Sequence, residues 1–502
     1  MRCYVVKELL LLITILVVSI PPLSSLVSMG QSSSEELLPI FNTTRRVIPD
    51  NLPWYPILVF GDNRPGDTKS AAYNPVFYRI VEEFDTILPI AVIGTGDYVG
   101  LGYEYQYLEF YRVLNSTRLE NLWLAVGNHD VEVSEGWDNW AKYIGPTNYY
   151  IDDIPGWRIG IVNTEVRLTK HWENQLKLMY ENLSNRSLLL AFHKPVFPDV
   201  DHNIRSDWIP VTLNTFSSYG YPKVVLQGHW HGWGYSIRYN VTWIVTGGAG
   251  APLYTYEVTK PEEGDIVTGV YHYTVLILYP NGTFRFYPVD IGSGKFSVKK
   301  LDDTSYLVVN SRVNLRGEPV EIPVRVKFTY NGVEVYTVLM APPRSSVEVS
   351  YSTIDGVHIA ISCNATEWYV YVCNPVDPNI SHVSLPVNGT ATIDLSVVLG
   401  STTPTMASKE TVSTGYTPTR SSPAIEESTQ VEKPKSTPTL KSSPLHPTSP
   451  TPIPHRTTEL PSTLQKPWVA PETDFKPFLR VLCGVLLALG LGTAIWLFSR
   501  KT

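Results

Sequence analysis

Short apolar runs alternate with longer amphipathic stretches between residues 57 and 289. Such runs are typical of buried strands in an α/β sheet, and the amphipathic stretches between them indicate helices. The predicted strands are Ile57–Phe60, Ile90–Ile93, Leu122–Val126, Ile159–Val162, Leu188–Phe192 and Val224–Leu226. The predicted helices are Pro75–Phe84, Tyr103–Leu114 and Lys170–Leu183. This part of the chain is therefore predicted to be an α/β domain.

Later runs alternate apolar and polar positions more strictly. They are Trp243–Val245, Tyr271–Leu278 and Thr283–Tyr287. Alternation favours strands with one covered and one solvated face, so we expect an antiparallel return sheet here. After Phe296 the helix signals disappear, and segments rich in Val, Thr and Tyr recur between turns such as Asn331-Gly332. The pattern predicts a small β-sandwich over residues 296–400.

The first thirty residues have the order of a secretory signal. Arg2 and Lys7 precede the apolar run Leu9–Ile20, and prolines follow it. Residues 1–30 are therefore predicted to be a signal peptide. An N-terminal membrane helix is the alternative, and the shortness of the apolar run argues against it.

The C-terminal end has the pattern of a membrane anchor. Val481–Phe498 is a run of apolar and small residues between Arg480 on one side and Arg500 on the other. We predict one transmembrane helix over residues 479–498, with the basic flank in the cytoplasm. The expected product is a single-pass protein of the cell membrane with an extracellular head.

Residues 401–475 are dominated by Ser, Thr, Pro and Lys and hold too few large apolar groups for a core, which predicts a disordered stalk. Sequons for N-glycosylation agree with export and predict a glycoprotein. They begin at Asn42, Asn115, Asn182, Asn185, Asn240, Asn281, Asn364, Asn379 and Asn388. Outside the predicted signal and anchor the cysteines are Cys363 and Cys373, and a disulfide between them agrees with an oxidising compartment.

The formal net charge of the chain is −7, from 40 basic and 47 acidic residues, and no basic block is present. Proteins that bind nucleic acid concentrate Lys and Arg on one face or along one helix. The sequence therefore carries no electrostatic footprint for a nucleic-acid partner.

Nearly every strand of the predicted α/β domain ends in a residue that can bind a metal. These residues are Asp62, Asp97, Asn128, His129, His193, His229 and His231. A single aspartate at a strand end is often only a helix cap. In α/β sheets, however, sites gather beyond the carboxyl ends of the strands, so an ordered set of such residues indicates a metal centre. Mixed oxygen and imidazole ligands suit manganese, iron or zinc rather than calcium.

The order of these residues resembles that of the calcineurin-like metallophosphoesterase superfamily, which includes the purple acid phosphatases. Its Gly-Asn-His-Asp/Glu and Gly-His-x-His blocks are present as Gly127–Asp130 and Gly228–His231, and the resemblance covers about Ile57–Gly250. It implies an α/β fold class: a two-sheet metallophosphoesterase sandwich flanked by helices, over residues 41–295. The all-β sandwich, the stalk and the transmembrane helix would follow this domain.

The resemblance also implies a centre of two divalent or trivalent metal ions. Asp97 would bridge them, with Asp62 and His231 on the first ion. The second ion would be bound by Asn128, His193 and His229. His129 would protonate the leaving oxygen or steady the phosphoryl group. The implied activity is hydrolysis of phosphate esters by a metal-activated hydroxide, and the implied partner is a phosphate ester substrate.

Two departures from the family pattern concern the first ion. Many members have Asp-x-His where this chain has Asp62-Asn63-Arg64. Purple acid phosphatases place a tyrosine three residues after the bridging aspartate, where this chain has Gly100. Tyr98 is a candidate substitute, although neighbouring strand residues point to opposite faces. Arg64 is expected to bind phosphate oxygens, and a surface salt bridge is its alternative role.

Other interpretations stay open at this point. One tight ion in the second position would suit a phosphodiesterase or nuclease. Loss of the first ion would leave a non-catalytic surface binding or adhesion module, against which the presence of His129 argues. Asp199 and His202 are candidates for the mouth of the site, and Asp130 for a structural role.

Overall fold

The computed structural model describes residues 38–254, 263–373 and 389–395. The predicted signal peptide, stalk and anchor lie outside the described residues. No helix within the described part is long and apolar enough to cross a membrane.

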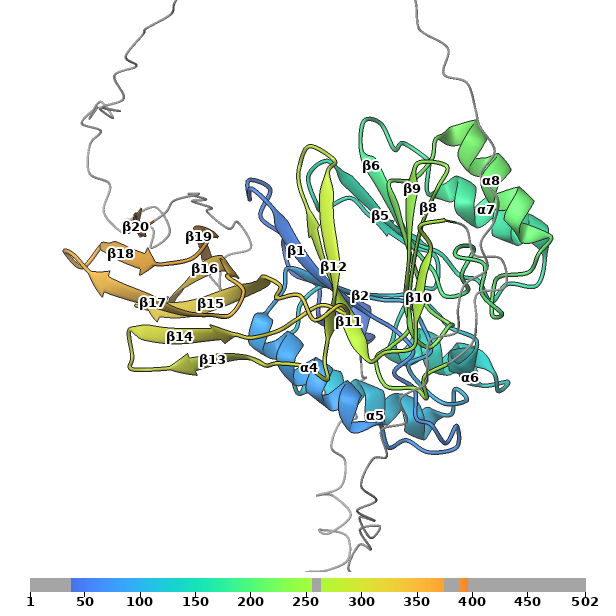
Figure 1. The fold of residues 1–502 in the computed structure, drawn as a ribbon, viewed down its shortest axis with the longest axis horizontal. Helices are drawn as coiled ribbons and strands as arrows, with labels where there is room; N and C mark the ends of the chain where they lie inside the picture. Colours follow the sequence, from blue (N-terminus) through green and yellow to red (C-terminus); the bar gives the residue numbers. More distant parts are fainter. Residues whose placement is uncertain (1–37, 255–262, 374–388, 396–502) are drawn as a thin grey trace, which may run out of the picture. The chain divides into compact units, whose positions relative to one another are not determined.

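Five strands form the first sheet, in the order β12-β11-β1-β2-β3 (Figure 1). They are β1 (Tyr55–Phe60), β2 (Ala91–Gly94), β3 (Leu122–Leu124), β11 (His272–Leu278) and β12 (Phe284–Asp290). The first three strands are parallel, whereas β11 is antiparallel to β1 and β12 to β11. The expected antiparallel return is therefore present at this edge.

Seven strands form the second sheet, in the order β10-β8-β9-β7-β6-β5-β4. They are β4 (Tyr149–Ile151), β5 (Trp157–Ile161), β6 (Ser187–Ala191), β7 (Val224–Gln227), β8 (Trp233–Arg238), β9 (Val241–Thr246) and β10 (Ile266–Thr268). Strand β9 runs parallel to β7 and antiparallel to β8. The expected antiparallel pairing of Trp243–Val245 is therefore present on one side of the strand only, because alternation along a strand does not specify both of its neighbours.

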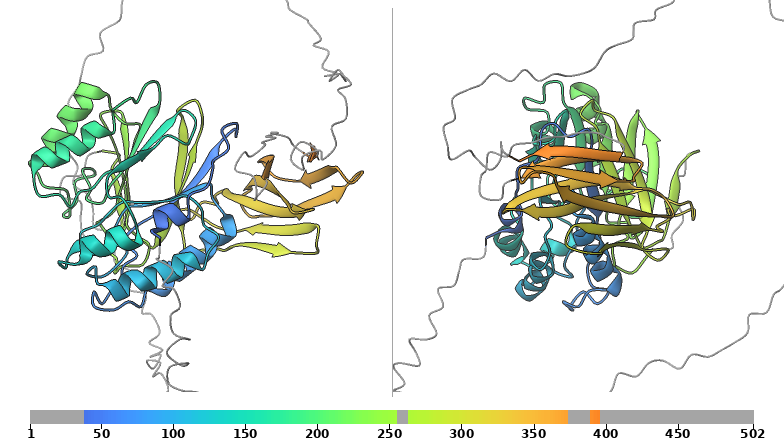
Figure 2. Two further views of the ribbon diagram at one scale, coloured as in Figure 1. Left: turned by 180° about the vertical axis from the view of Figure 1, so that it is seen from behind. Right: turned by 90° about the vertical axis from the view of Figure 1, so that its left-hand side faces the viewer.

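Helices cover the outer faces of both sheets, as Figures 1 and 2 show. The described helices are α3 (Ile40–Thr43), α4 (Pro75–Ile87), α5 (Glu104–Asn115), α6 (Gly136–Tyr143), α7 (Thr169–Leu178) and α8 (Trp208–Tyr219), with the short 3₁₀ helix η1 (His129–Val131). The predicted helices correspond to α4, α5 and α7, while α6 and α8 were not predicted. Phe60 of β1 contacts Phe77 of α4 at 6.0 Å between ring centroids.

Alternate residues of one strand show how the layers are built. In β6, Leu189 and Ala191 pack in the core between the two sheets, while Leu188 and Leu190 pack with Trp172 of α7. Every one of these side chains except Leu188 is fully buried. Strands covered on both faces become continuously apolar, which is the pattern that the sequence shows.

The described strands after residue 295 form two further, entirely antiparallel sheets. One contains β13 (Phe296–Lys300), β14 (Ser305–Asn310), β17 (Ser345–Thr353), β18 (His358–Cys363) and β20 (Gly389–Asp394). The other contains β15 (Ile322–Tyr330), β16 (Val333–Ala341) and β19 (Glu367–Cys373). Cys363 is a free, buried thiol. The side chain of Cys373, its expected disulfide partner, lies outside the described part of the structure.

A buried ion pair connects this β-rich region to the first helix of the α/β region. Arg312, which follows β14, donates from Nε to Glu83 of α4 at 2.9 Å, and its Nη2 bonds the other carboxylate oxygen. The hydroxyl of Tyr273 donates to the same carboxylate at 2.9 Å. Because both charges are buried and hydrogen-bonded, removal of either residue would leave the other charge buried without a partner.

Candidate metal centre

Three turns at strand ends carry predicted site residues in a left-handed backbone conformation. Asp62 follows β1 with a φ of 56°, Asp97 follows β2 with 58°, and His229 follows β7 with 66°. Residues other than glycine seldom adopt positive φ, although Asp and His do so more often than most. Such positions cost about 1–3 kcal/mol each and cluster at functional sites.

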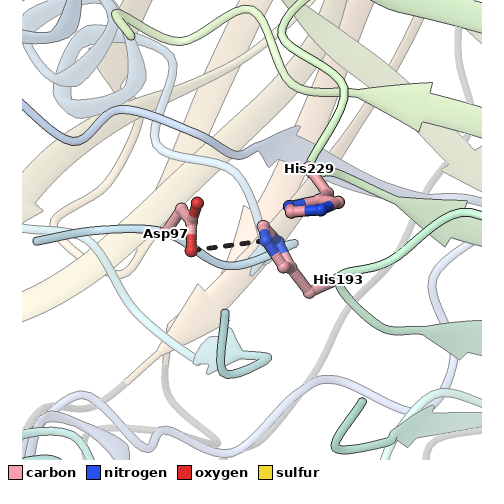
Figure 3. A group of neighbouring side chains, drawn as sticks. All are labelled: Asp97, His193 and His229. Carbon is pink, nitrogen blue, oxygen red and sulfur yellow. Dashed lines mark ion pairs between the residues drawn. The ribbon is translucent and has the colours of Figure 1, made fainter. Parts of the chain in front are cut away.

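The turns bring two sets of ligand atoms together, and both sets contain Asp97. The ligand atoms of Asp62, Asp97 and His231 all lie within 4.8 Å of one another, as do those of Asp97, His193 and His229. Figure 3 shows the ring of His193 directed at the Asp97 carboxylate, with His229 beside it. Nε2 of His193 lies 3.3 Å from Oδ1 of Asp97. A carboxylate shared by two donor sets has the position of a bridging ligand.

Three strand-end turns and two glycine-flanked histidine blocks thus meet at the strand ends of a two-sheet sandwich, with Asp97 in the bridging position. A two-sheet sandwich flanked by helices is the fold that the resemblance to the calcineurin-like metallophosphoesterases implies.

Comparisons were made with known sequences and structures. The sequence matches no protein-family model and no curated protein. Similar solved structures include GAP50, the anchor in the inner membrane complex of Plasmodium: 11% identity, 48% of this chain and 86% of that chain covered, TM-score 0.38. A purple acid phosphatase from yellow lupin (Lupinus luteus) is 14% identical over 53% of this chain and 52% of that chain, with a TM-score of 0.39. A dimetal phosphatase from Danio rerio is 12% identical over 46% of this chain and 98% of that chain, with a TM-score of 0.34. The identities are below 25% and the TM-scores below 0.5, so these likenesses say nothing about the activity of this chain.

The orientation of two imidazoles fits metal ligation. Nδ1 of His193 donates to the carbonyl of Thr95 at 2.9 Å, and Nδ1 of His231 donates to that of Pro252 at 2.7 Å. A carbonyl oxygen only accepts, so each Nδ1 carries a proton, and Nε2 is the nitrogen that can ligate a metal when the ring is neutral. In metal sites a ligating histidine usually donates its other N–H in this way.

The oxygen donors are also incompletely satisfied by the protein. Oδ2 of Asp97 is buried and has no hydrogen-bond partner among the residues that the structure describes. A buried carboxylate oxygen without a partner costs free energy, which a bound cation would offset. Oδ1 of Asn128 lies 3.1 Å from Nε2 of His193, so the amide faces the same point as the imidazole. The donor set therefore fits a metal.

Burial and the mutual charges of the site set its pKa values. Burial raises the pKa of Asp62 well above its ordinary value. Burial acts in the same direction on Asp97, but His193 outweighs it and holds the Asp97 pKa below the ordinary range. Burial lowers the pKa of His193, yet Asp97 overcomes this and raises it to about 9. Burial lowers the pKa of His229 well below normal and that of His231 to about 4, so both rings are neutral. Neutral imidazole is the ligating form.

Arg64 lies inside the site, not on the surface. Its relative exposure is 8%, and its Nε is 3.8 Å from Oδ2 of Asp97. The alternative of a surface salt bridge is therefore excluded. Besides burial, the charge of Arg64 lowers the pKa of His231, so the guanidinium lies close to the proposed ligands of the first ion.

Tyr98 is not part of the site, so its expected role as a substitute ligand was wrong. Its ring is fully buried and stacks on Phe110 at 5.0 Å between centroids. Its hydroxyl accepts a hydrogen bond from the backbone N–H of Gly96 at 3.1 Å. The side chain thus points into the aromatic core beneath the turn, as the opposite-face argument indicated.

His129 is oriented by two acceptors on one of its ring nitrogens. Nδ1 lies 2.8 Å from the carbonyl of Gly100 and 3.1 Å from Oε2 of Glu132. The backbone N–H of His129 donates to Oδ1 of Asp97 at 3.0 Å, which fixes the residue beside the bridging position. Sequence reasoning missed Glu132, because an exposed glutamate just after a short 3₁₀ helix carries no distinguishing signal.

Asp130 has a structural role, in agreement with the sequence-based interpretation. The same motif requires close backbone approach, because a Cβ atom at Gly127 would overlap Asp97 and one at Gly228 would overlap Asp62. Only glycine, which has no Cβ atom, fits at these two positions, so both histidine blocks begin with glycine.

Two aromatic rings border the predicted ligands. Tyr254 stacks on His231 at 4.1 Å and on His202 at 4.6 Å between ring centroids. The His202 ring is 5.6 Å from that of His229, so this candidate for the mouth lies beside the site. Asp199 is half-buried on the same segment. Sequence reasoning missed Tyr254, which follows the glycine turn without any motif of its own.

Proposed function

We propose that this chain is a metal-dependent hydrolase of phosphate esters. The observation that carries the proposal is the presence of Asp97 in both sets of ligand atoms. The proposed ligands of the first ion are Asp62, Asp97 and His231, and those of the second are Asp97, Asn128, His193 and His229. Manganese, iron or zinc bound there would polarise the phosphoryl oxygens and lower the pKa of an attacking water.

His129 is proposed to act as the general acid. Its Nδ1 proton is held by Gly100 and Glu132, so Nε2 is the atom left to meet the ester. Protonated His129 would donate the Nε2 proton to the leaving oxygen as the P–O bond breaks, and the product would depart as a neutral alcohol. The carboxylate of Glu132 would stabilise the imidazolium before the transfer.

Arg64 is proposed to bind the phosphoryl oxygens of the substrate. A buried guanidinium offers paired N–H donors that match the oxygens of a phosphate. Among the described residues, Nε of Arg64 has no hydrogen-bond acceptor, so it is available to a phosphate oxygen. The same cation lies near the Asp97 carboxylate and opposes binding of the first ion. This observation favours a second candidate, a phosphodiesterase or nuclease that works with one tight ion at the His193 and His229 position.

The proposed setting is an extracellular head on a single-pass anchor in the cell membrane. It is supported only by the sequence of residues 1–30, 401–475 and 479–498. Protease treatment of intact cells that express the chain would remove the head if it is outside. Resistance of the head in intact cells, with digestion after lysis, would contradict the setting and leave the enzymatic proposal untouched.

The activity is tested with the purified full-length chain, stripped of metal and reconstituted with manganese, zinc or iron. The substrates are p-nitrophenyl phosphate, a monoester, and bis(p-nitrophenyl) phosphate, a diester. We expect metal-dependent turnover that Asp97→Asn abolishes and that the exposed control Asp138→Asn leaves unchanged. Preference for the diester would select the second candidate. Metal binding without turnover on either ester would contradict the hydrolase proposal and favour a binding module.

A further inference from the structure

A cavity distinct from the metal centre lies between the edges of the two sheets of the α/β region. Its volume is about 390 Å³, and none of the proposed metal ligands lines it. Its walls include Trp233 and Tyr235 of β8, Ile266 and Thr268 of β10, Phe286 of β12, and Arg316. Strand β10 is the last strand of the second sheet and β12 that of the first. A cavity of this size is within the range of small-molecule sites.

Register shows that the β8 side chains point between the sheets. Trp233 pairs with Thr246 of β9, and Tyr235 pairs with Ile244. Ile244 belongs to the core between the sheets, and Thr246 bonds Thr274 of β11 in the other sheet at 3.2 Å. Residues paired across antiparallel strands share a face, so Trp233 and Tyr235 face the first sheet.

The aromatic rings form one continuous apolar wall. Trp233 and Tyr235 are nearly parallel, with centroids 5.9 Å apart and an interplanar angle of 12°. Tyr235 contacts Phe286 across the gap between the sheets at 5.6 Å. Both Tyr235 and Phe286 are only partly buried, so their rings are available to a ligand. A planar ring would bury the largest apolar area against such a wall.

The polar rim of the cavity selects the charge of the ligand. The acidic group there, Glu318, accepts a hydrogen bond from Nδ2 of Asn314 at 2.7 Å. Arg316 is exposed, and no carboxylate within the described residues pairs with its guanidinium. A guanidinium at the mouth of an apolar cavity favours an anionic group on the ligand.

We propose that this cavity binds a planar aromatic anion. The ring lies against Tyr235 and Phe286, and the anionic group pairs with Arg316. The site is separate from the metal centre and does not depend on the proposed hydrolase activity.

The test uses the full-length chain and two fluorescent naphthalene probes, 8-anilinonaphthalene-1-sulfonate and its neutral analogue N-phenyl-1-naphthylamine. We expect Tyr235→Ala to raise the Kd of both probes at least tenfold. Arg316→Gln should raise the Kd of the sulfonate about fivefold or more and leave that of the neutral probe unchanged. Tyr239→Ala, which removes an exposed tyrosine outside the cavity, is the matched control.

The proposal is overturned if Tyr235→Ala and Tyr239→Ala have equal effects, because the probes would then be binding exposed rings in general. It is also overturned if Arg316→Gln changes both probes equally or neither. Arg316 is a surface residue, so its variant keeps the test valid even if Tyr235→Ala does not fold. Thermal melts of each variant identify that case.

Discussion

Oδ2 of Asp130 accepts a hydrogen bond from the backbone N–H of Asp97 at 3.0 Å, so one buried carboxylate holds the turn that carries another. The same oxygen accepts from Gly127 at 2.8 Å. Oδ1 accepts from the next two residues of the turn, Tyr98 at 2.8 Å and Val99 at 3.1 Å. Asp130 therefore joins the turn after β2 to the Gly127–Asp130 block, and the spacing of the two motifs depends on it.

Replacement of this carboxylate by an amide should loosen both motifs at once. In Asp130→Asn one oxygen becomes an NH₂ group, which leaves two backbone N–H donors without an acceptor. At about 1–3 kcal/mol for each unsatisfied buried donor, we expect a loss of about 3 kcal/mol in the free energy of unfolding. Urea denaturation measures this loss. The exposed control Asp138→Asn should stay within about 0.5 kcal/mol, and an equal loss in both would contradict the role of Asp130.

Proton donation by His129 predicts a dependence on the leaving group. His129→Gln should lower kcat by about 10²–10⁴ for phenyl phosphate, whose leaving oxygen needs a proton, and by less for p-nitrophenyl phosphate. Glu132→Gln should cost less than about tenfold on either ester, because the Gly100 carbonyl still holds Nδ1–H. Steady-state kinetics on the two esters decide the matter. Equal losses with His129→Gln would mean that the residue steadies the phosphoryl group and is not the acid.

Removal of Arg64 should have opposite effects on metal and substrate. Two opposite charges about 4 Å apart interact by about 4 kcal/mol at an effective dielectric constant of about 20, so Arg64 partly neutralises Asp97. We expect Arg64→Ala to tighten binding of the first ion at least tenfold and to lower kcat/KM for the monoester. Equilibrium dialysis with Mn²⁺ measures the affinity and the number of ions. With the exposed Arg112→Ala as control, an unchanged first affinity would show that Arg64 does not compete with the ion.

His272 predicts a specific acid sensitivity of the fold. Burial lowers its pKa to about 4, while the ring accepts or donates to Thr246 and bonds the Val270 carbonyl. Between the ordinary histidine pKa near 6.5 and pH 4, the unfolded chain binds a proton that the folded chain does not, so stability falls as the pH falls through this window. The contribution is about 3 kcal/mol, from about 1.4 kcal/mol for each pKa unit.

The free energy of unfolding of wild type and of His272→Gln is measured at pH 7 and at pH 4.5. The fall in stability between the two pH values should be smaller in the variant by the contribution of His272. His171→Gln, at an exposed position of α7, should keep the full pH dependence. Parallel pH curves for wild type and His272→Gln would contradict the assignment to His272, whatever Asp290 and other groups contribute.

The site was largely accessible from the sequence because one rule governs it. The carboxyl ends of neighbouring parallel strands meet at one edge, so Asp62 and Asp97 had to approach once β1 and β2 were identified, as did His193 and His229 after β6 and β7. The two pairs belong to different sheets, and their meeting depends on how the sheets pack, which the rule does not give. The rule does not describe side chains that reach the site from elsewhere. Glu132 lies just after a short 3₁₀ helix and Tyr254 lies in a loop, where neither a periodic pattern nor a motif marks them.

Elements of the fold were predictable where the hydrophobic periodicity along the chain is strong. They were not predictable where the neighbouring strand or helix determines the structure. Helix α8 contains a proline in its first turn and several hydroxyl residues, which hid its helical pattern. Strand β9 is parallel to β7 although its sequence alternates, because its covered face is chosen by the sheet that it joins. Tyr98 was considered as a ligand on sequence distance alone, whereas the left-handed Asp97 turns the chain so that the tyrosine ring enters the core.

The ion pair of Arg312 and Glu83 gives the β-rich region a meaning beyond that of a spacer. A chain cut after residue 295 would lose Arg312, the buried partner of Glu83, and would expose the face of helix α4 that lies against β13 and β15. Loss of these contacts would lower the stability of what remains, and an ordinary domain is stable by only about 5–15 kcal/mol. The segment that looks like a removable neck is therefore a thermodynamic part of the head, and the smallest unit that folds well should extend at least through the strands that hold Arg312.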